Sequence, residues 1–374
     1  MNIIEDIHEL IRNPYRYGEE YKKETRKKVV GYFCSYTPEE VIFAADALPF
    51  RIFGVSDNIQ QAESHLQAYC CSLVRRSLED GLSGRLDFLD GIVFPHTCDS
   101  MQRLSDIWRM NLSFTFHFDV VLPVKLNTES AMVYFKDVIK AYIRDLEYAM
   151  DTDISDVKLK QSISIFNRIR STIQRIYEIK RLNPDVIKGS DVYSIVRASM
   201  IMDRHLLLEK LLQITAQLEA NNNSPTPAAA RTRIVLTGGN CTHADIYDII
   251  EDAGAVVVWD DLCTGSRLFE GMLNTDTDPI TAITERYFER VVCPAKHANL
   301  TGRAENLIET VKQKRADGVI FLLLKFCDPH AFDYPYLKGY LDKEGIPSML
   351  LEMEDQFPSP GQLKTRIEAF LEII

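Results

Sequence analysis

Cysteine is the residue type whose number and placement most clearly suggest chemistry in this chain. The sequence of 374 residues contains eight cysteines: Cys34, Cys70, Cys71, Cys98, Cys241, Cys263, Cys293 and Cys327. A free cysteine is most often a small buried side chain, and in a reducing compartment thiols rarely pair as structural disulfides. That explanation weakens here, because Cys34, Cys98, Cys263 and Cys327 each follow a segment that predicts a β-strand.

Two segments repeat one pattern, in which Asp-Gly precedes an apolar run and Cys-Asp follows it. They are residues 90–99 and residues 317–328. The unbroken apolar run from Gly318 to Leu324 predicts a strand buried on both faces, which is typical of a parallel sheet. Asp328-Pro329 then predicts a helix start, with Asp328 as N-cap and Pro329 as the first helical residue. A thiol between a strand end and a helix N-terminus is expected to favour the thiolate, and the repeat predicts two related halves.

Several kinds of thiol chemistry fit such an arrangement to different degrees. Zinc sites usually use pairs of ligands at short spacing, and the sequence has no Cys-x2-Cys pair. A ferredoxin-type run of cysteines is also absent from the sequence. Single thiolates from two domains fit a cluster in the cleft between them, with Cys71 and Cys293 completing the set. A cysteine nucleophile remains an alternative, since His96 lies near Cys98 and His330 near Cys327.

Other candidate groups lie in the second half of the chain. Positive charges near Cys263 and Cys293 could bind phosphates of a coenzyme, and they are Arg267, Lys296, His297 and Arg303. The carboxylates after the last predicted strand could act as acid or base, and they are Glu352, Glu354 and Asp355. Gly238-Gly239 is only a weak phosphate-loop signal, because the full spaced glycine pattern is missing. Ordinary surface charge explains each of these charged side chains at least as well.

The elements that must position the thiols alternate between strand and helix in both halves of the chain. This alternation predicts an α/β fold with parallel sheets and right-handed crossovers. We predict three parts: an N-terminal α/β domain (1–127), a helical segment and linker (128–230), and a C-terminal α/β domain (231–374). The fold class is therefore two Rossmann-like parallel-sheet domains with a mainly helical central segment.

Composition narrows the possible partners. The net charge of -11 argues against nucleic acid or an anionic membrane as the main partner. No apolar run reaches the roughly 18 residues that a membrane-spanning helix needs. The N-terminus begins with an acidic, amphipathic stretch and shows no secretory signal. We therefore expect a cytoplasmic protein.

Several separated motifs resemble the 2-hydroxyacyl-CoA dehydratase and benzoyl-CoA reductase superfamily, in the order in which that family has them. The similar residues are Gly31, Pro38-Glu39-Glu40, Cys71, the run from Gly84 to Gly91, Cys98-Asp99, Lys325-Phe326-Cys327-Asp328, Asp333-Tyr334-Pro335, Gln362 and Thr365-Arg366. The similarity covers nearly the whole chain and is weakest in the central helices. It implies two Rossmann-like domains with an iron–sulfur cluster between them.

The resemblance also implies a ligand set and a partner. In family subunits with one four-iron cluster, three cysteines are ligands, and the matching positions are Cys71, Cys98 and Cys327. An ATP-hydrolysing iron–sulfur activator supplies a low-potential electron in these systems. In the dehydratases that electron makes a ketyl radical of a 2-hydroxyacyl-CoA, and hydroxide leaves. In the reductases, electrons are consumed in reducing an aromatic ring.

Three further cysteines match a third branch, the double-cubane cluster proteins. These are Cys34, Cys263 and Cys293, so the chain offers the six thiolates that two bridged cubanes require. The resemblance thus implies an iron–sulfur redox enzyme component with a double cubane, acting on a small substrate that we expect to be an acyl-CoA thioester. The alternative is a single four-iron subunit of a heterodimeric dehydratase or reductase, partly a structural or electron-relay subunit. The expected protein partners are the activator and either a second copy of this chain or a related subunit. A third hypothesis of function is a cysteine-dependent acyltransferase without metal.

Overall fold

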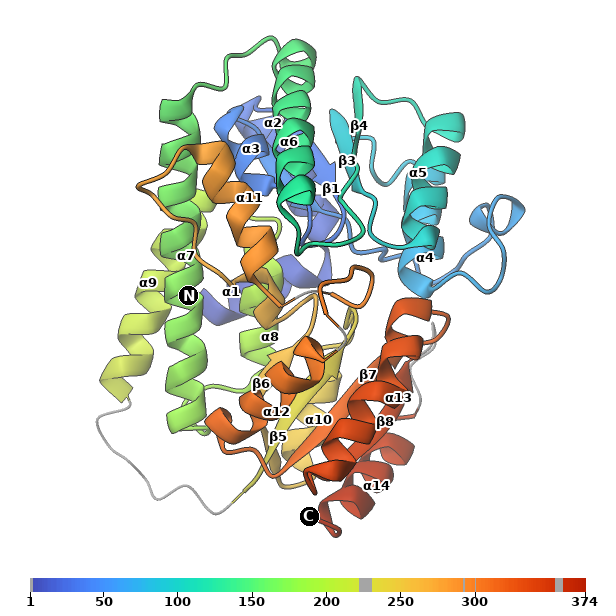
Figure 1. The fold of residues 1–374 in the computed structure, drawn as a ribbon, viewed down its shortest axis with the longest axis vertical. Helices are drawn as coiled ribbons and strands as arrows, with labels where there is room; N and C mark the ends of the chain where they lie inside the picture. Colours follow the sequence, from blue (N-terminus) through green and yellow to red (C-terminus); the bar gives the residue numbers. More distant parts are fainter. Residues whose placement is uncertain (1–2, 222–230, 292, 300, 354–358) are drawn as a thin grey trace.

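Two parallel β-sheets form the framework of the protein. The computed structural model describes residues 3–221, 231–291, 293–299, 301–353 and 359–374. Within these ranges each sheet has four strands, and Figure 1 shows the first sheet in the upper half of the molecule and the second in the lower half. The first sheet consists of β1 (Val29–Tyr32), β2 (Leu48–Arg51), β3 (Gly91–Pro95) and β4 (Phe116–Val120). The second consists of β5 (Thr232–Gly238), β6 (Ala255–Asp261), β7 (Gly318–Leu324) and β8 (Ser348–Met353).

The two sheets have the same topology, which confirms the α/β class with two Rossmann-like parallel sheets. Their strand orders are β2-β1-β3-β4 and β6-β5-β7-β8, and all pairings are parallel. The repeated Asp-Gly explains part of this likeness. The Asp90 carboxylate accepts from the Val29 amide at 2.8 Å, and the Asp317 carboxylate accepts from the Arg233 amide at 2.7 Å. Each aspartate therefore ties the start of one central strand to the start of its neighbour.

The glycine that follows each aspartate permits close packing at the same place. A Cβ atom at Gly91 would lie 2.7 Å from the Phe116 ring. A Cβ atom at Gly318 would lie 2.8 Å from Cδ1 of Ile374. Both distances are too short for a real contact, so a side chain at either position would push the neighbouring element away.

Helices cover both faces of each sheet. The first half contains α1 (Ile3–Arg12), α2 (Pro14–Thr25), α3 (Glu39–Ala44), α4 (Ser72–Leu82) and α5 (Asp99–Asn111). The central helices are α6 (Glu129–Met150), α7 (Asp156–Leu182), α8 (Gly189–Ser199) and α9 (Arg204–Asn221). The last part contains α10 (Asp245–Asp252), α11 (Pro279–Glu289), α12 (Gly302–Lys314), α13 (Asp328–Lys343) and α14 (Pro360–Leu371). None of the helices in the described ranges is both long and apolar enough to cross a bilayer.

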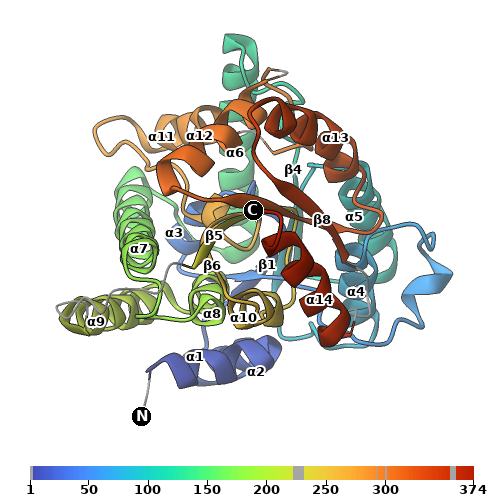
Figure 2. The same ribbon diagram turned by 90° about the horizontal axis from the view of Figure 1, so that it is seen from below.

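The second sheet shows how strand alternation divides the core. Ile320 and Leu322 of β7 pack toward α10 and α14, whereas Val319 and Phe321 pack toward α12 and α13. Figure 2 shows these two helix pairs on opposite sides of the sheet. Successive residues of a strand point to opposite faces, so the unbroken apolar run predicted from the sequence fills two cores at once.

The central helices join the two halves. The long helix α7 runs beside both sheets and packs against α3, α9, α11 and β6 (Figure 1). Buried residues of α6 and α7 share one cluster with Ile283 and Tyr287 of α11. The two halves therefore pack against the same central helices and share one hydrophobic cluster with them.

Two local predictions from sequence patterns are wrong, one for residues 60–82 and one for Thr37-Pro38-Glu39-Glu40, whose pattern predicts Thr37 as a helix N-cap with Pro38 as the first helical residue. The periodicity of residues 60–82 predicts one helix, but only α4 is helical beyond a short 3₁₀ turn at Ala62–Ser64. The Glu79 carboxylate accepts from the amides of Gln60 and Ala62, so a contact distant in sequence holds this stretch outside a helix. Thr37 does not cap α3, because its hydroxyl donates to the Phe33 carbonyl at 2.7 Å.

Candidate functional site

One cavity between the two sheets brings together the six cysteines selected from the sequence. The cavity measures about 90 Å³, and its lining includes Cys34, Cys71, Cys98, Cys263, Cys293 and Cys327. Apolar side chains from α4 and α5, among them Leu73, Val74 and Met101, also line it. The carboxyl ends of both sheets therefore face each other across this cavity, which is where parallel α/β sheets place ligands.

Strand ends and helix starts position these thiols. Cys98 follows β3 and is the N-cap residue of α5, and Cys327 follows β7 and is the N-cap residue of α13. Asp328 is thus the first residue of α13, one position later in the helix than the sequence predicts. Cys71 is the N-cap residue of α4, so it does not lie inside a helix as the periodicity suggests. Each of these three thiols stands at the end of a rigid element.

The chain reverses sharply just after two central strands. Cys34 has a φ of 55° and Phe326, directly before Cys327, has a φ of 64°. Residues other than glycine rarely adopt this left-handed conformation, which costs on the order of 1–3 kcal/mol. Backbone strain of this kind is found where the surrounding structure fixes a side chain for a function. Here the two strained residues lie in the loops that carry Cys34 and Cys327 to the cavity.

The loop after β6 is fixed by a buried ion pair. Arg267 donates to the Asp261 carboxylate at 2.6 and 2.8 Å, and its third nitrogen lies 3.8 Å from the Cys263 sulfur as a donor. Thr237 of β5 donates to the same carboxylate at 2.9 Å. Arg267 therefore contacts both the carboxylate of Asp261, at the end of β6, and the sulfur of Cys263, one of the cavity thiols.

The backbone of Cys293 forms hydrogen bonds with residues of both halves of the protein. Its amide donates to the Tyr36 hydroxyl at 3.2 Å, and its carbonyl accepts from the Lys296 amide at 2.8 Å. The buried Lys296 ammonium donates to the carbonyl of His96 at 2.7 Å. A segment of the second half is thereby bound to the loop that carries Cys98.

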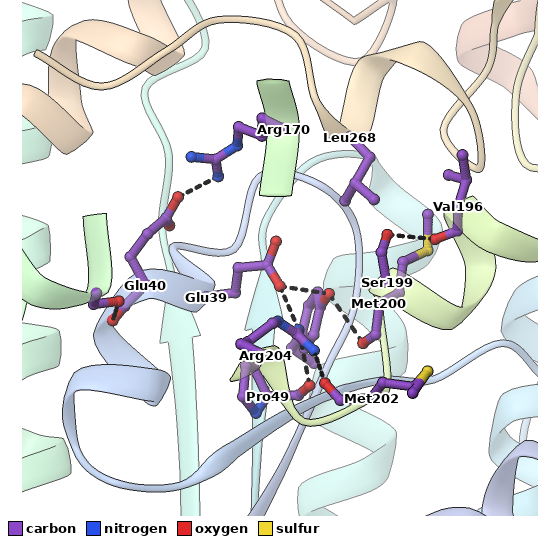
Figure 3. Close-up of polar contacts among 12 residues, drawn as sticks. Glu39, Glu40, Pro49, Arg170, Val196, Ser199, Met200, Met202, Arg204 and Leu268 are labelled. Atoms are coloured by element: carbon purple, nitrogen blue, oxygen red, sulfur yellow. Dashed lines mark hydrogen bonds and ion pairs between the residues drawn. The ribbon is translucent and has the colours of Figure 1, made fainter. Parts of the chain in front are cut away.

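Behind Cys34, two buried ion pairs fix the short helix α3. Arg204 of α9 donates to Glu39 at 2.7 Å and to the Pro49 carbonyl at 3.1 Å, while Arg170 of α7 donates to Glu40 (Figure 3). Burial alone would raise the pKa of Glu40, but the guanidinium groups of Arg170 and Arg286 outweigh it and lower that pKa. Sequence patterns around these glutamates do not reveal the ion pairs, since the arginine partners lie more than a hundred positions away in the chain.

The six thiols are electrostatic neighbours of one another. A thiolate at Cys71, Cys98 or Cys263 would raise the pKa of Cys327, and one at Cys263 or Cys34 would raise the pKa of Cys293. A thiolate at Cys34 would likewise raise the pKa of Cys98. Following the family resemblance, we call Cys71, Cys98 and Cys327 the first set, and Cys34, Cys263 and Cys293 the second set.

Burial dominates the acidity of four of the cavity thiols, contrary to the expectation of stabilised thiolates. It raises the pKa of Cys71 and of Cys293 to about 12. It also raises the pKa of Cys98 and of Cys327. The helix dipole at an N-cap is too weak to offset the loss of solvation. The raised pKa values favour the neutral form of Cys71, Cys98, Cys293 and Cys327 without a bound cation, so a metal would have to displace their protons.

The remaining cysteines and the histidines have other surroundings. Cys241 is buried, and its sulfur donates to the His243 carbonyl at 3.4 Å. Neither Cys241 nor Cys70 lines the cavity. His96 pairs with Asp119 at 3.1 Å, whereas His330 is buried at the cavity wall. Within the described part of the chain, neither Cys98 nor Cys327 shares a hydrogen bond with a histidine ring, so a thiol–imidazole pair is not formed.

Of the other groups singled out from the sequence, Gly239 lines the cavity, whereas the following residues are occupied elsewhere or lie apart from it. Arg303 pairs with Asp333 at 2.7 Å, and the His297 amide donates to the Val124 carbonyl at 2.9 Å. Gly238 fits tightly against β7, since a Cβ there would lie 2.0 Å from the Leu322 carbonyl oxygen, which gives the glycine a packing role. Glu352 is exposed on β8. Glu354 and Asp355 lie outside the described residues.

The donor set fits a cluster better than a single ion. In the described ranges, no three Cys, His, Asp or Glu side chains are arranged to share one metal ion. A four-iron cluster has different requirements, because each thiolate binds a different iron atom and the ligands need not converge on one point. Six thiols around one cavity with apolar walls supply the ligand type that such clusters use.

Comparison with known proteins agrees with the resemblance seen in the sequence. Residues 34–374 match the family model described as "2-hydroxyglutaryl-CoA dehydratase, D-component". The chain is 27% identical over 369 residues to the (R)-phenyllactyl-CoA dehydratase beta subunit of Clostridium sporogenes, covering 99% of this chain and 98% of that protein. It is 28% identical over 332 residues to one of the subunits of the benzoyl-CoA reductase of Thauera aromatica, covering 86% and 84%.

A third relative is the lactoyl-CoA dehydratase subunit beta of Anaerotignum propionicum, which is 27% identical over 379 residues and covered to 98%. All three relatives are named as subunits, and they span dehydratases and a reductase of CoA thioesters. The matched region includes all six cavity cysteines, from Cys34 to Cys327. The chain belongs to the family of 2-hydroxyglutaryl-CoA dehydratase D-components.

Proposed function

We propose that this protein is an iron–sulfur redox enzyme component that accepts low-potential electrons and reduces or dehydrates a small substrate. The observation that carries the proposal is the gathering of six thiols from both halves around one cavity. In this proposal the first set binds one four-iron unit and the second set binds another, as a double cubane. The six cysteines that line the cavity equal the number of protein thiolates that such a cluster would require.

The bound cluster would supply one-electron transfer at low potential. The protein's own residues would hold it and set its surroundings. Arg267 donates toward the Cys263 sulfur. Lys296 lies near enough to Cys34, Cys293 and Cys98 that negative charge on these thiols would favour its ammonium form. Both cations would offset part of the negative charge of the thiolates, and the apolar walls would limit access of water.

The names of the relatives support a substrate class and a partner subunit for the proposed enzyme. Those proteins are named for phenyllactyl-CoA, lactoyl-CoA and benzoyl-CoA, so we propose an acyl-CoA thioester as substrate. An ATP-hydrolysing iron–sulfur activator would deliver the electron, and a second copy or a related subunit would complete the enzyme. We expect it to work in the cytoplasm.

Anaerobic purification of the full chain tests the cluster directly. The proposal predicts a brown protein with about eight irons and a similar amount of labile sulfide per chain. A colourless protein with under about one iron per chain, purified without air, would overturn it and would revive the metal-free acyltransferase hypothesis. In that case, one fast-reacting thiol whose alkylation abolishes activity would identify the nucleophile.

A second candidate function is that of a single-cluster subunit whose chemistry lies in a partner chain. The names of the relatives favour it, since each is named as one subunit of a larger enzyme and two of them are beta subunits. It predicts about four irons per chain, held by the first set. Turnover of an acyl-CoA by the isolated chain with activator and ATP would eliminate it.

A further inference from the structure

The cavity of six thiols is lined by a buried guanidinium group, one nitrogen of which has no hydrogen-bond partner among the described residues. Arg51 is the last residue of β2, its side chain is 2% exposed, and it lines the cavity. Its Nη1 atom has no hydrogen-bond partner within the described ranges. The contact found for the guanidinium is with the Tyr32 ring, whose centre lies 5.9 Å from it. A ring face offsets charge weakly and accepts no hydrogen bond at that distance.

Arg51 differs from the other cations near these thiols in its place at the cavity. The buried Arg290 also has an Nη1 atom without a hydrogen-bond partner among the described residues, but it lies over the rings of Tyr36 and Tyr287 and does not line the six-thiol cavity. Arg267 forms two hydrogen bonds with Asp261, and Lys296 donates to backbone carbonyls. Leaving a charge or donor unpaired in a buried site is costly, so native proteins nearly always provide a partner. Because Arg51 lines the cavity, a group bound there could supply that partner.

A second unpartnered donor lines the same cavity from the other half of the protein. Asn240 follows β5, and its Nδ2 atom is buried without a hydrogen-bond partner among the described residues. Its loop is firmly held, because the Gly239 carbonyl accepts from Cys263 at 3.0 Å and the Cys241 amide donates to Thr264 at 3.1 Å. Two donors on rigid supports, one of them charged, create a site for a negatively charged acceptor.

We propose that Arg51 and Asn240 bind a compact anionic acceptor, of about the size of formate, beside the six thiols. Resting on the proposed function, this acceptor has two possible sources with the same chemistry. It is either an oxygen of the bound substrate, on which negative charge develops during reduction, or an inorganic sulfide of the cluster. In both cases Arg51 supplies the positive charge and Asn240 fixes the direction of approach.

The test uses the full chain purified anaerobically, in wild type and in Arg51→Gln, Arg51→Lys and Asn240→Leu variants. Formate is titrated while the visible and paramagnetic spectra of the cluster are recorded, and the midpoint potential is measured without formate. Arg197→Gln is the matched control. That guanidinium is also buried, lies 4.1 Å from the Phe53 ring centre and does not line the cavity.

A ligand oxygen predicts that formate perturbs the wild-type spectra and that Arg51→Gln weakens its binding at least about tenfold, with a smaller loss in Arg51→Lys. A cluster sulfide predicts no effect of formate, but a more negative midpoint potential in Arg51→Gln than in the Arg197→Gln control. Unchanged potential together with no formate binding would overturn the inference. If the chain contains no iron, the proposed function fails, and broadening of the ¹³C-formate resonance in wild type but not in Arg51→Gln still tests the anion site.

Discussion

At the scale of single residues, Asp260 is the buried carboxyl group with the most unusual environment near the cavity loops. Its oxygens accept from Tyr177 at 3.0 Å, from Tyr247 at 2.8 Å and from the Ser266 amide at 2.9 Å. Burial raises the pKa of Asp260 to about 7, despite these donors. Asp260 thereby supports the loop that carries Cys263 and Arg267.

The raised pKa of Asp260 makes stability depend on pH. Between about pH 4 and pH 7 the unfolded chain loses this proton while the folded protein keeps it, so the free energy of unfolding falls as pH rises. We predict that Asp260→Asn gains stability relative to wild type over this window, by on the order of 2–4 kcal/mol. Urea unfolding at pH 4.5 and pH 8 measures the difference. Asp342→Asn, at an exposed site on α13, is the control, and an equal pH dependence in Asp260→Asn and wild type would refute the assignment.

At the scale of elements, α3 is too short to be stable by itself and depends on its ion pairs. It has six residues, and both Glu39 and Glu40 are buried against arginines of α9 and α7. Removing one member of a buried pair leaves an unpaired charge in the interior. The helix that directly follows Cys34 is therefore held by side chains from the central helical segment.

We predict that Arg170→Met lowers the free energy of unfolding by about 3–5 kcal/mol, because it leaves Glu40 buried and unpaired. The loss should be smaller at low pH, since protonation of Glu40 removes the charge. Arg175→Met is a matched control on the same helix. Its ion pair with Glu219 at 2.7 Å is half exposed, so its loss should cost at most about 1 kcal/mol. Equal losses in the two variants would show that Glu40 does not depend on Arg170.

The two sheets and the approximate position of the cysteines could be predicted from the sequence. The apolar run of β7 and the repeated Asp-Gly predict two related parallel sheets, because strand burial and local packing depend on neighbouring residues. Four cysteines follow predicted strands, and the carboxyl ends of parallel strands lie at one edge of a sheet, so the sequence also predicts that these cysteines lie close together. The N-cap position of Cys71, the pairing of Glu39 with Arg204 and the unpartnered Arg51 could not be predicted. They arise from contacts between segments that are far apart in the chain.

At the scale of the whole molecule, the two halves contribute equally to the cavity. Cys34, Cys71 and Cys98 come from the first half, and Cys263, Cys293 and Cys327 come from the second. Both proposed ligand sets combine residues of both halves, so a bound cluster would crosslink them. We predict that cluster loading raises the midpoint of thermal unfolding, because a ligand that binds only the folded state stabilises it. Anaerobic calorimetry before and after iron chelation measures this shift, and an unchanged midpoint would contradict a shared cluster.

The iron content of cysteine variants tests the central claim most directly. We predict about eight irons per chain in wild type and about four in the triple variant Cys34→Ser, Cys263→Ser and Cys293→Ser, which removes the second set. Cys70→Ser is the matched control, since Cys70 adjoins Cys71 in sequence but does not line the cavity, and it should keep the wild-type value. Equal iron content in the triple variant and in wild type would contradict the claim that six thiols share one double cluster.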